Sequence, residues 1–249
     1  MAAHRKILYC GDSEAGGAAN YLLACLAHGR FQVTHLPPAK MLAPALLRTQ
    51  FDAILFSDYA AEKVPAASQR RIEEHVRAGR GFMMIGGWCS FAARYGKWKN
   101  SRIENLLPVS ALHRDDRRNF PSGLLMTRKA PHTGIFRGLN LNTGTPVICG
   151  LNELKARSSG RVLLSARELR VNQGRIAATG REFPLLTISR DPSRRVAAFA
   201  TDFAPHWCGG LVDWGRKRLT LPVNSRIRVE VGGDYARFIV NLVNWLSKA

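Results

Sequence analysis

Long apolar runs are missing from this sequence of 249 residues. No stretch approaches the roughly 20 apolar residues that a helix needs to cross a bilayer, which argues against a helical membrane protein. Residues 1–6 lead directly into a short apolar segment and lack the longer apolar region and small-residue cleavage site of a signal peptide. We therefore expect a cytoplasmic protein with no membrane partner.

Cysteine is scarce, and its spacing excludes the usual cysteine-based architectures. The count is odd, the spacing is wide, and no two cysteines form a CxxC pair, so a disulfide framework is excluded and a zinc site is disfavoured. His206 and Cys208 lie close in sequence, but two ligands do not complete a tetrahedral site. We expect neither a bound metal nor a cofactor. The five cysteines are Cys10, Cys25, Cys89, Cys149 and Cys208.

Acidic residues are few, 18 against 37 basic ones, which gives a formal net charge of +19. Such a charge attracts polyanions without sequence preference, so it is compatible with nucleic acid or an anionic metabolite as partner. Alternatively, the surface is simply rich in arginine. The basic residues are spread over the chain and no RNA-binding motif with interleaved aromatic residues is present, which favours this second interpretation over nucleic-acid binding. The basic clusters lie at 70–71, 117–118, 194–195 and 216–218.

The first third of the chain alternates between short apolar runs and amphipathic segments. We predict buried strands at 7–10, 52–57 and 81–85, and a strand of alternating character at 31–35. Between them we predict a helix that ends at Gly29, a short helix at 41–47, and a helix at 68–78 with Ser68 as its N-cap. This alternation implies right-handed crossovers and a doubly wound, mostly parallel sheet.

The rest of the chain predicts an addition to that sheet rather than a second domain. Short apolar pieces at 162–165, 168–171, 175–178 and 184–189 suggest an antiparallel extension at one sheet edge. A buried strand at 195–201 and a helix capped by Asp234 follow. No repeat or low-complexity linker divides the chain, so we expect one flavodoxin-like α/β domain over residues 1–249. Homo-oligomerisation stays open.

Polar groups follow four of the predicted strands, and these strand ends are the candidate site. In open α/β sheets, ligands bind outside the carboxyl ends of the strands. If the sheet is parallel, all four ends lie on one edge, with Asp58 after the third strand and Asp202 after the last long one. The four segments are 11–12, 57–58, 86–90 and 201–206.

The turn at 86–90 carries the strongest local signal. Gly87-Trp88-Cys89 after a strand resembles the first half of a nucleophile elbow, where a strained turn presents the nucleophile beside an oxyanion hole. Phe91 stands where an elbow has its second glycine. Cys89 is therefore either a nucleophile, with amides near Gly87 and Ser90 holding the oxyanion, or a small buried apolar residue.

The segment after the last predicted strand could supply the partners of such a nucleophile. His206 could act as base and Asp202 could orient it. Alternatively, Asp202 caps backbone amides and His206 packs between Pro205 and Trp207 in a structural loop. The glycine-rich stretch at 11–17 is neither a GxGxxG nor a Walker sequence, which disfavours a phosphate loop there.

Several of these segments together resemble the glutamine amidotransferase-like family of the class I glutamine amidotransferase superfamily, which is related to ThuA-like proteins. The resemblance implies a flavodoxin-like fold and places Cys89 near the nucleophilic cysteine of the superfamily. The His-Pro-Glu arrangement of that superfamily has no counterpart in Ala204-Pro205-His206. The segments that carry the resemblance are 7–9, 56–58, 77–81, 84–88, 90–91 and 198–207.

Two functions fit these observations. The first is a hydrolase or amidotransferase-like enzyme acting on a small polar metabolite, with Cys89, His206 and Asp202 as catalytic residues. The second is a non-catalytic domain that binds a sugar-like or other polar ligand at the same edge of the sheet. The residues expected to contact the ligand are Asp58, Gly87, Trp88, Ser90 and Trp207.

Overall fold

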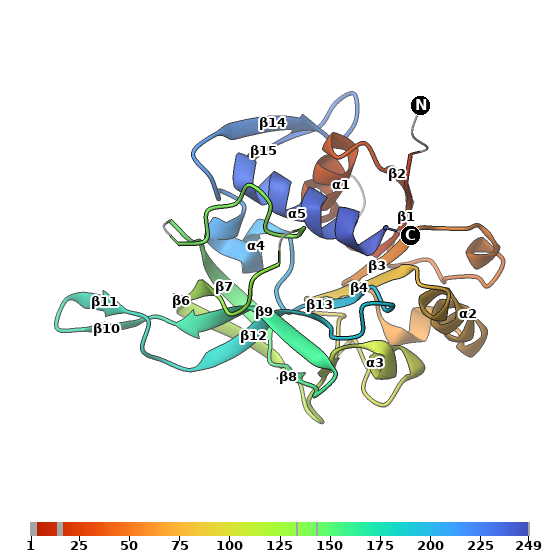
Figure 1. Cartoon of the computed structure of the whole chain (residues 1–249), viewed down its shortest axis with the longest axis horizontal. Helices are drawn as coiled ribbons and strands as arrows, with labels where there is room; N and C mark the ends of the chain where they lie inside the picture. The colour runs from red at the N-terminus through yellow and green to blue at the C-terminus, as the bar shows by residue number, and fades with distance from the viewer. Residues whose placement is uncertain (1–3, 14–16, 133, 143, 249) are drawn as a thin grey trace.

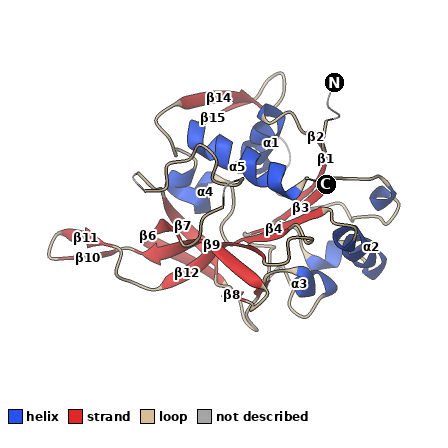
Figure 2. Cartoon of the chain, in the orientation of Figure 1, coloured by secondary structure: helices blue, strands red, loops and turns tan. Residues whose placement is uncertain are grey.

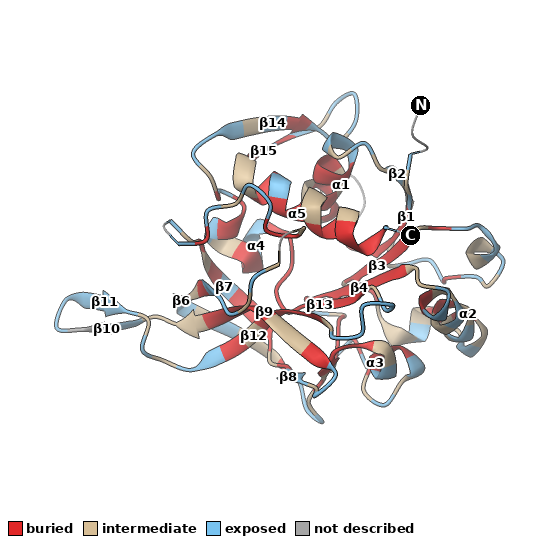
Figure 3. Cartoon of the chain, viewed as in Figure 1, coloured by how far each residue is buried: buried red, intermediate tan, exposed pale blue. Residues whose placement is uncertain are grey.

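Five parallel strands form the half of the structure that positions the candidate site. The computed structural model describes residues 4–13, 17–132, 134–142 and 144–248. The parallel strands run in the order β2-β1-β3-β4-β13, which is the flavodoxin-like order. The central residues of β1, β3, β4 and β13 are buried, as expected for strands covered on both faces, whereas the edge strand β2 is partly exposed (Figure 3). The strands are β1 (Lys6–Gly11), β2 (Gln32–Leu36), β3 (Ala53–Ser57), β4 (Gly81–Ile85) and β13 (Val196–Phe199).

Helices cover both faces of this parallel half. The helices α1 (Ala19–His28) and α5 (Gly233–Leu246) pack on one face, whereas α2 (Ala66–Arg77) and the short α3 (Arg102–Leu106) lie on the other (Figure 1). The doubly wound prediction is therefore confirmed. A further short helix, α4 (Pro205–Cys208), follows β13.

Both predicted helix caps are wrong. Ser68 lies inside α2, is fully buried, and donates its hydroxyl hydrogen bond to the carbonyl of Leu42, so it ties the helix to the preceding loop. Pro65 occupies the cap position, in an extended conformation that suits the start of a helix. Asp234 lies in the first turn of α5 and pairs with Arg237, one turn along.

The short helix predicted at 41–47 is also wrong. Only a 3₁₀ turn at Leu46–Arg48 forms in this region. Pro44 lacks a backbone N–H, and the amide of Leu42 bonds to the carbonyl of Lys63 instead of to a helical neighbour. Leu42 is fully buried, so packing and this long-range hydrogen bond override the apolar spacing.

Four antiparallel strands extend the sheet beyond β13 in the order β12-β9-β6-β7, which confirms the predicted extension. A small hairpin projects from the far end of this extension (Figures 1 and 2). The extension contains β6 (Arg117–Arg128), β7 (Val147–Asn152), β9 (Gly160–Glu168) and β12 (Glu182–Ser189). The remaining elements are β5 (Val109–Ser110), β8 (Lys155–Ala156), β10 (Arg170–Asn172), β11 (Arg175–Ala177), β14 (Arg218–Pro222), β15 (Arg228–Gly232), and the 3₁₀ turns Ala61–Lys63 and Gly209–Leu211.

The register of the parallel strands places their carboxyl ends in one row. Gly11 is opposite Ser57, Ser57 is opposite Ile85, and Ile85 is opposite Phe199. The segments that follow β1, β3, β4 and β13 therefore emerge side by side. Within the described residues, no helix combines the length and the apolar character needed to cross a membrane.

Gly11 holds two of these strand ends together, and its replacement tests that packing. Its φ of +111° is rarely adopted by other residues, and a Cβ there would overlap the carbonyl oxygen of Ser57. We expect Gly11→Ala to lower the free energy of unfolding by roughly 3 kcal/mol or more, because both backbone strain and steric overlap arise. Urea unfolding followed by circular dichroism measures this loss.

Gly174→Ala is the matched control for that substitution. Gly174 also has a positive φ, +73°, but nothing lies within 4 Å of the position that a Cβ would take. Its replacement should cost only about 1 kcal/mol, the conformational part alone. Equal losses for the two variants would show that the contact with Ser57 does not constrain the strand ends.

Candidate functional site

Three aspartates gather where the parallel strands end. Asp12 follows β1, Asp58 follows β3, and Asp202 follows β13. Asp12 and Asp58 both have a φ of +48°, so the backbone turns sharply at the end of β1 and again at the end of β3. Asp12 and Asp202 are buried, with 8% and 2% exposure, and Asp58 is partly buried. β1 and β3 flank the point where strand order reverses, which is the usual ligand crevice of this topology.

Burial raises the pKa of all three carboxyl groups, and neighbouring carboxyl groups add to the increase for Asp58 and Asp202. Burial raises the pKa of Asp58 to about 7, and the charge of Asp12 contributes to the increase. Burial, then the charges of Asp12 and Asp58, raise the pKa of Asp202 well above its usual range. Like charges in a poorly solvated space disfavour simultaneous ionisation. The cluster therefore retains protons at a pH where isolated carboxyl groups have lost them.

Tyr9 and His35 hold Asp12 in place: Tyr9 through a hydrogen bond, and His35 through its stacking on Tyr9. Burial also raises the pKa of Asp12, and hydrogen bonds from Tyr9 and Ser57 oppose that increase. The Tyr9 hydroxyl donates to Asp12 Oδ2, and the Tyr9 ring stacks on His35 at 4.8 Å between centroids. His35 Nε2 lies 2.8 Å from the carbonyl of Gly11. Asp12 is therefore held by a fixed set of aromatic and backbone contacts.

Asp202 and His206 form the pair predicted from the sequence. His206 Nε2 lies 3.1 Å from Asp202 Oδ2, and about half of the His206 side chain is exposed. The two groups are close but do not have the geometry of a hydrogen bond, so Asp202 Oδ2 is buried without a hydrogen-bond partner among the described residues. The Thr201 hydroxyl is also buried and has no hydrogen-bond partner among these residues. Asp202 Oδ1 accepts a hydrogen bond from the amide of Cys208, at 3.1 Å.

The turn after β4 wraps around the carboxyl group of Asp58. The amide of Cys89 donates to Asp58 Oδ1 at 2.7 Å, and the amide of Trp88 also donates to this carboxyl group. Gly87 has a φ of +153°, and a Cβ there would overlap the Asp58 carboxyl. The absence of a side chain at this position thus lets the turn approach the acid. The amides of an oxyanion hole are here occupied by the protein's own carboxyl group.

A second polar support holds the same turn from the antiparallel half. Asn152, at the end of β7, accepts a hydrogen bond from the Gly87 amide at 2.9 Å and donates to the Gly87 carbonyl at 3.2 Å. It also donates to Asp116 Oδ1 at 2.8 Å, and Asp116 Oδ2 accepts from the Ala92 amide. Burial raises the pKa of Asp116 to about 6. The Gly87 amide is therefore engaged as well.

Cys89 is partly buried and lacks two features of a nucleophile in an elbow. Apart from Gly87, the residue with a positive φ in this turn is Phe91, at +48°, not Cys89, and α3 begins only at Arg102. Burial, then the charges of Asp58 and Glu62, raise the pKa of the Cys89 thiol to about 11. A high pKa leaves little of the reactive thiolate at neutral pH.

The other predicted ligand contacts differ in their accessibility. Trp88 is 47% exposed, and the Arg117 guanidinium lies 4.3 Å from the centre of its ring, at the edge of the site. Ser90 is buried, donates to the Ile85 carbonyl and accepts from the Asp58 amide. Trp207 is buried, and its indole N–H donates to Asn119 Oδ1 at 2.9 Å. Trp88 thus faces solvent, whereas Ser90 and Trp207 brace the structure around the site.

Sequence reasoning placed segment 11–12 at the site but assigned Asp12 no role, and it missed Asn152 and Asp116 altogether. Asp12 had a usable signal, because it follows a strand as directly as Asp58 does. Asn152 and Asp116 lie in the irregular middle of the sequence, where no pattern indicates that β7 returns beneath the Gly87 turn. No group of three His, Cys, Asp or Glu side chains among the described residues is arranged to hold a metal ion.

The topology and the row of strand-end acids define a flavodoxin-like α/β protein with a polar site at the switch point of the sheet. A family model described as "Putative glutamine amidotransferase" matches residues 9–225. This match spans most of the sequence, and the chain belongs to that family. The resemblance inferred from the sequence is therefore confirmed. No functionally curated protein matches the sequence.

Solved structures share the fold. The chain is similar to "Cytoplasmic Protein STM3548" from Salmonella typhimurium, at 23% identity and a TM-score of 0.70, with 96% of this chain and 98% of that chain covered. It is also similar to "Cytoplasmic Protein STM1381" from Salmonella typhimurium LT2, at 24% identity and a TM-score of 0.71, covering 98% and 100%. A "Putative thua-like protein" from Parabacteroides merdae ATCC 43184 aligns at 12% identity and a TM-score of 0.63, covering 99% and 91%.

The raised pKa of Asp58 predicts a dependence of stability on pH. Between the ordinary carboxyl pKa near 4 and about 7, the folded chain keeps a proton that the unfolded chain loses, so stability falls as pH rises through this window. Asp58→Asn removes this contribution while keeping a side-chain oxygen for the turn amides. We expect its melting temperature to fall less between pH 5 and 8 than that of the wild type.

Asp213→Asn controls for the loss of a carboxyl group at the surface. The Asp213 side chain is 65% exposed and pairs with Arg218. Differential scanning calorimetry at several pH values compares the three proteins. If Asp58→Asn and the wild type have the same slope between pH 5 and 8, the carboxyl group of Asp58 does not retain its proton.

The raised pKa of Cys89 predicts slow alkylation. Relative to a thiol with the usual value of 9.0, a pKa of about 11 leaves about 100-fold less thiolate at neutral pH. We expect Cys89 to react with iodoacetamide at least about 100-fold more slowly than a short unstructured cysteine peptide. The measurement uses Cys149→Ser, because Cys149 is exposed, with mass spectrometry of the labelled peptides. Alkylation as fast as in the peptide contradicts the raised pKa.

Proposed function

We propose that this glutamine amidotransferase-like protein binds a small polar metabolite at the strand-end site and hydrolyses an amide-type bond in it. One observation carries the proposal. Asp202 Oδ2 and the Thr201 hydroxyl are buried without hydrogen-bond partners among the described residues, beside the exposed His206. Buried polar atoms are nearly always satisfied, so this position suits a hydroxyl, amide or water that forms hydrogen bonds with them.

The proposed chemistry assigns a role to each group. Asp202 orients His206, and His206 takes a proton from a water molecule as that water attacks the carbonyl carbon. Asp58, with a pKa of about 7, can donate a proton to the departing amine near neutral pH. Water is consumed, and a carboxylate and an ammonium are formed. Trp88, which is 47% exposed and whose amide donates to Asp58, offers an apolar surface beside these groups.

In this mechanism Cys89 is not the nucleophile. A thiol nucleophile requires a thiolate and free amides to stabilise the oxyanion. Here the thiol pKa is raised, and the amides of Gly87, Trp88 and Cys89 bond to Asn152 and Asp58. These observations favour a water-based mechanism over covalent catalysis by Cys89.

The same observations support a second candidate, a non-catalytic domain that binds a polar, sugar-like ligand. Its contacts would be Asp58, Trp88, Asp202 and His206, because aromatic rings beside carboxyl groups suit hydroxyl-rich molecules. Trp207, buried beneath the site, would support these contacts rather than touch the ligand. The word "Cytoplasmic" in the names of both Salmonella proteins supports a cytoplasmic location for either function.

Turnover of a panel of small amides, including glutamine, tests the proposal. We expect His206→Gln and Asp202→Asn to lower kcat/KM by about 100-fold or more, because they remove the base or its orientation. Cys89→Ser should retain activity within about threefold. His113→Gln, a change at an exposed histidine in another part of the chain, should leave activity unchanged.

The panel also separates the alternatives. Loss of activity in Cys89→Ser with full activity in His206→Gln identifies the thiol as the nucleophile. The absence of turnover, together with thermal stabilisation by a panel compound that depends on Asp202, supports the binding domain. If the wild-type protein hydrolyses none of the panel compounds and is stabilised by none of them, small amides are not its ligands.

A further inference from the structure

A basic groove lies at the end of β13 opposite the acidic site. It has a volume of about 370 Å³ and is lined by the end of β12, the loop before β13, the start of β9 and the last turn of α5. β13 starts at Val196, directly after the groove residue Arg195, whereas Asp202 follows the other end of the strand. The side chains that carry the argument are His132, Arg161, Arg190, Asp191, Arg195 and Trp245.

The three arginines of this groove lack carboxylate partners. No ion pair formed within the described part of the chain involves Arg161, Arg190 or Arg195. Arg161 donates to the carbonyl of Pro131 at 3.1 Å, and Arg190 donates to the carbonyl of Gly160 at 3.0 Å. These bonds to backbone fix two guanidinium groups without neutralising their charge.

The one acid in the lining is already engaged. Asp191 Oδ1 accepts hydrogen bonds from the amide and hydroxyl of Ser193, at 2.9 and 2.6 Å, and Oδ2 lies 3.6 Å from Arg194. These contacts lower the pKa of Asp191, so it stays ionised and directed toward its own loop. It therefore leaves the charge of the three groove arginines largely uncompensated.

Trp245 and His132 complete the groove. The Arg195 guanidinium lies 5.6 Å from the centre of the Trp245 ring, and His132 meets that ring edge-on at 5.7 Å. His132 Nδ1 accepts a hydrogen bond from the Ile135 amide at 3.1 Å, which leaves the Nε2–H of the neutral ring as a donor. Burial, then the charges of Arg161 and Arg195, lower the pKa of His132, as expected where positive charge is concentrated.

We propose that this groove binds a small phosphate monoester through its phosphate group. Guanidinium groups form bidentate hydrogen bonds with phosphate oxygens, and three unpaired cations are sufficient to neutralise a dianion. The volume is in the range of small-molecule sites, and its concave shape suits a metabolite better than an extended nucleic-acid backbone. The inference is independent of the amide chemistry proposed for the other end of β13.

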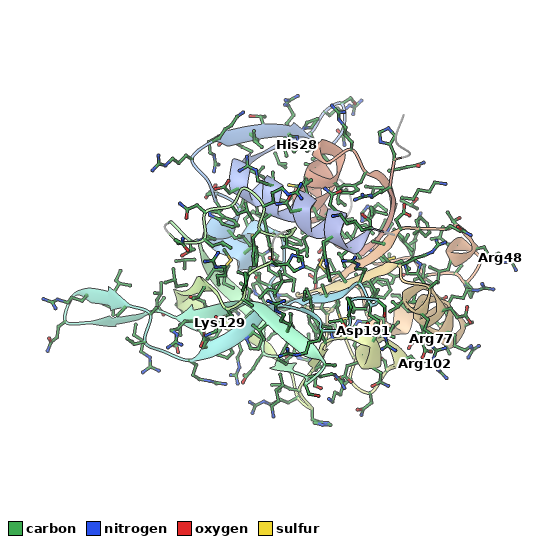
Figure 4. All side chains as sticks on the ribbon, viewed as in Figure 1. His28, Arg48, Arg77, Arg102, Lys129 and Asp191 are labelled. Carbon is green, nitrogen blue, oxygen red and sulfur yellow. The ribbon has the colours of Figure 1, made fainter. Side chains whose placement is uncertain are left out.

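Calorimetric titration at pH 7 with inorganic phosphate and with ribose 5-phosphate tests this site. We expect both to bind, and we expect Arg161→Gln/Arg195→Gln to weaken binding by at least about tenfold, because two charge-assisted contacts are lost. The matched control is Arg48→Gln/Arg70→Gln, which removes the same charge from exposed arginines. Figure 4 shows Arg48 at the outer end of its loop, away from Asp191.

Binding also has a spectroscopic signature. A bound dianion favours protonated His132, so its pKa measured by NMR should rise on addition of phosphate in the wild type and in the control but not in Arg161→Gln/Arg195→Gln. Should that double variant fail to fold, Arg161→Gln alone provides the comparison. No binding by wild type at about 10 mM ligand overturns the proposal, as does equal weakening in the control. Tighter binding of an unrelated single-stranded oligonucleotide, lost in the same variant, also overturns it in favour of nucleic acid.

Discussion

The register of the parallel strands is the constraint on which the site depends. Gly11, Ser57, Ile85 and Phe199 lie in one row, so whatever follows β1, β3, β4 and β13 must share a small space. The carboxyl groups of Asp12, Asp58 and Asp202 occupy this space together with the turn after β4, whose amides donate hydrogen bonds to Asp58. The approach is close because Gly11 and Gly87 have no side chain to keep the segments apart. The hydrogen-bond geometry of the site is therefore a consequence of strand pairing.

Burial gives these carboxyl groups their chemical character. Burial disfavours the ionised carboxyl group of Asp58, and the charge of Asp12 adds to this effect, so the pKa of Asp58 rises to about 7. The backbone amides of Trp88 and Cys89 partly offset that cost for Asp58, and Tyr9 does so for Asp12. The amides that would stabilise an oxyanion are used to stabilise a resident acid. An elbow-like sequence thus forms a binding turn for a carboxyl group.

The sequence predicted the architecture better than the contacts. Buried strands such as 81–85 stand out because both faces are apolar, and their alternation with helices dictates the parallel order. The prediction of Ser68 and Asp234 as helix N-caps was wrong, because cap propensity depends on residue type alone. It does not reveal that the Ser68 hydroxyl donates to the Leu42 carbonyl or that Asp234 pairs with Arg237 inside the helix. The proximity of Asp202 and His206 was predictable, since they are only four positions apart in sequence. The support from Asn152 was not, since it depends on a pairing between strands far apart in sequence.

The distribution of charge gives the net charge of +19 a structural meaning. Acids that do not pair with arginine or lysine concentrate at the carboxyl end of β13, while unpaired arginines line a groove at its amino end. A generally arginine-rich surface would distribute its cations evenly and leave concave regions no more basic than convex ones. A second cavity also includes Trp245 in its lining, together with the basic residues Arg5, Arg137 and Lys248. One strand of four residues thus separates a cluster of carboxyl groups whose pKa values are raised from a groove of unpaired cations, and only the groove presents a fixed charge that attracts anions.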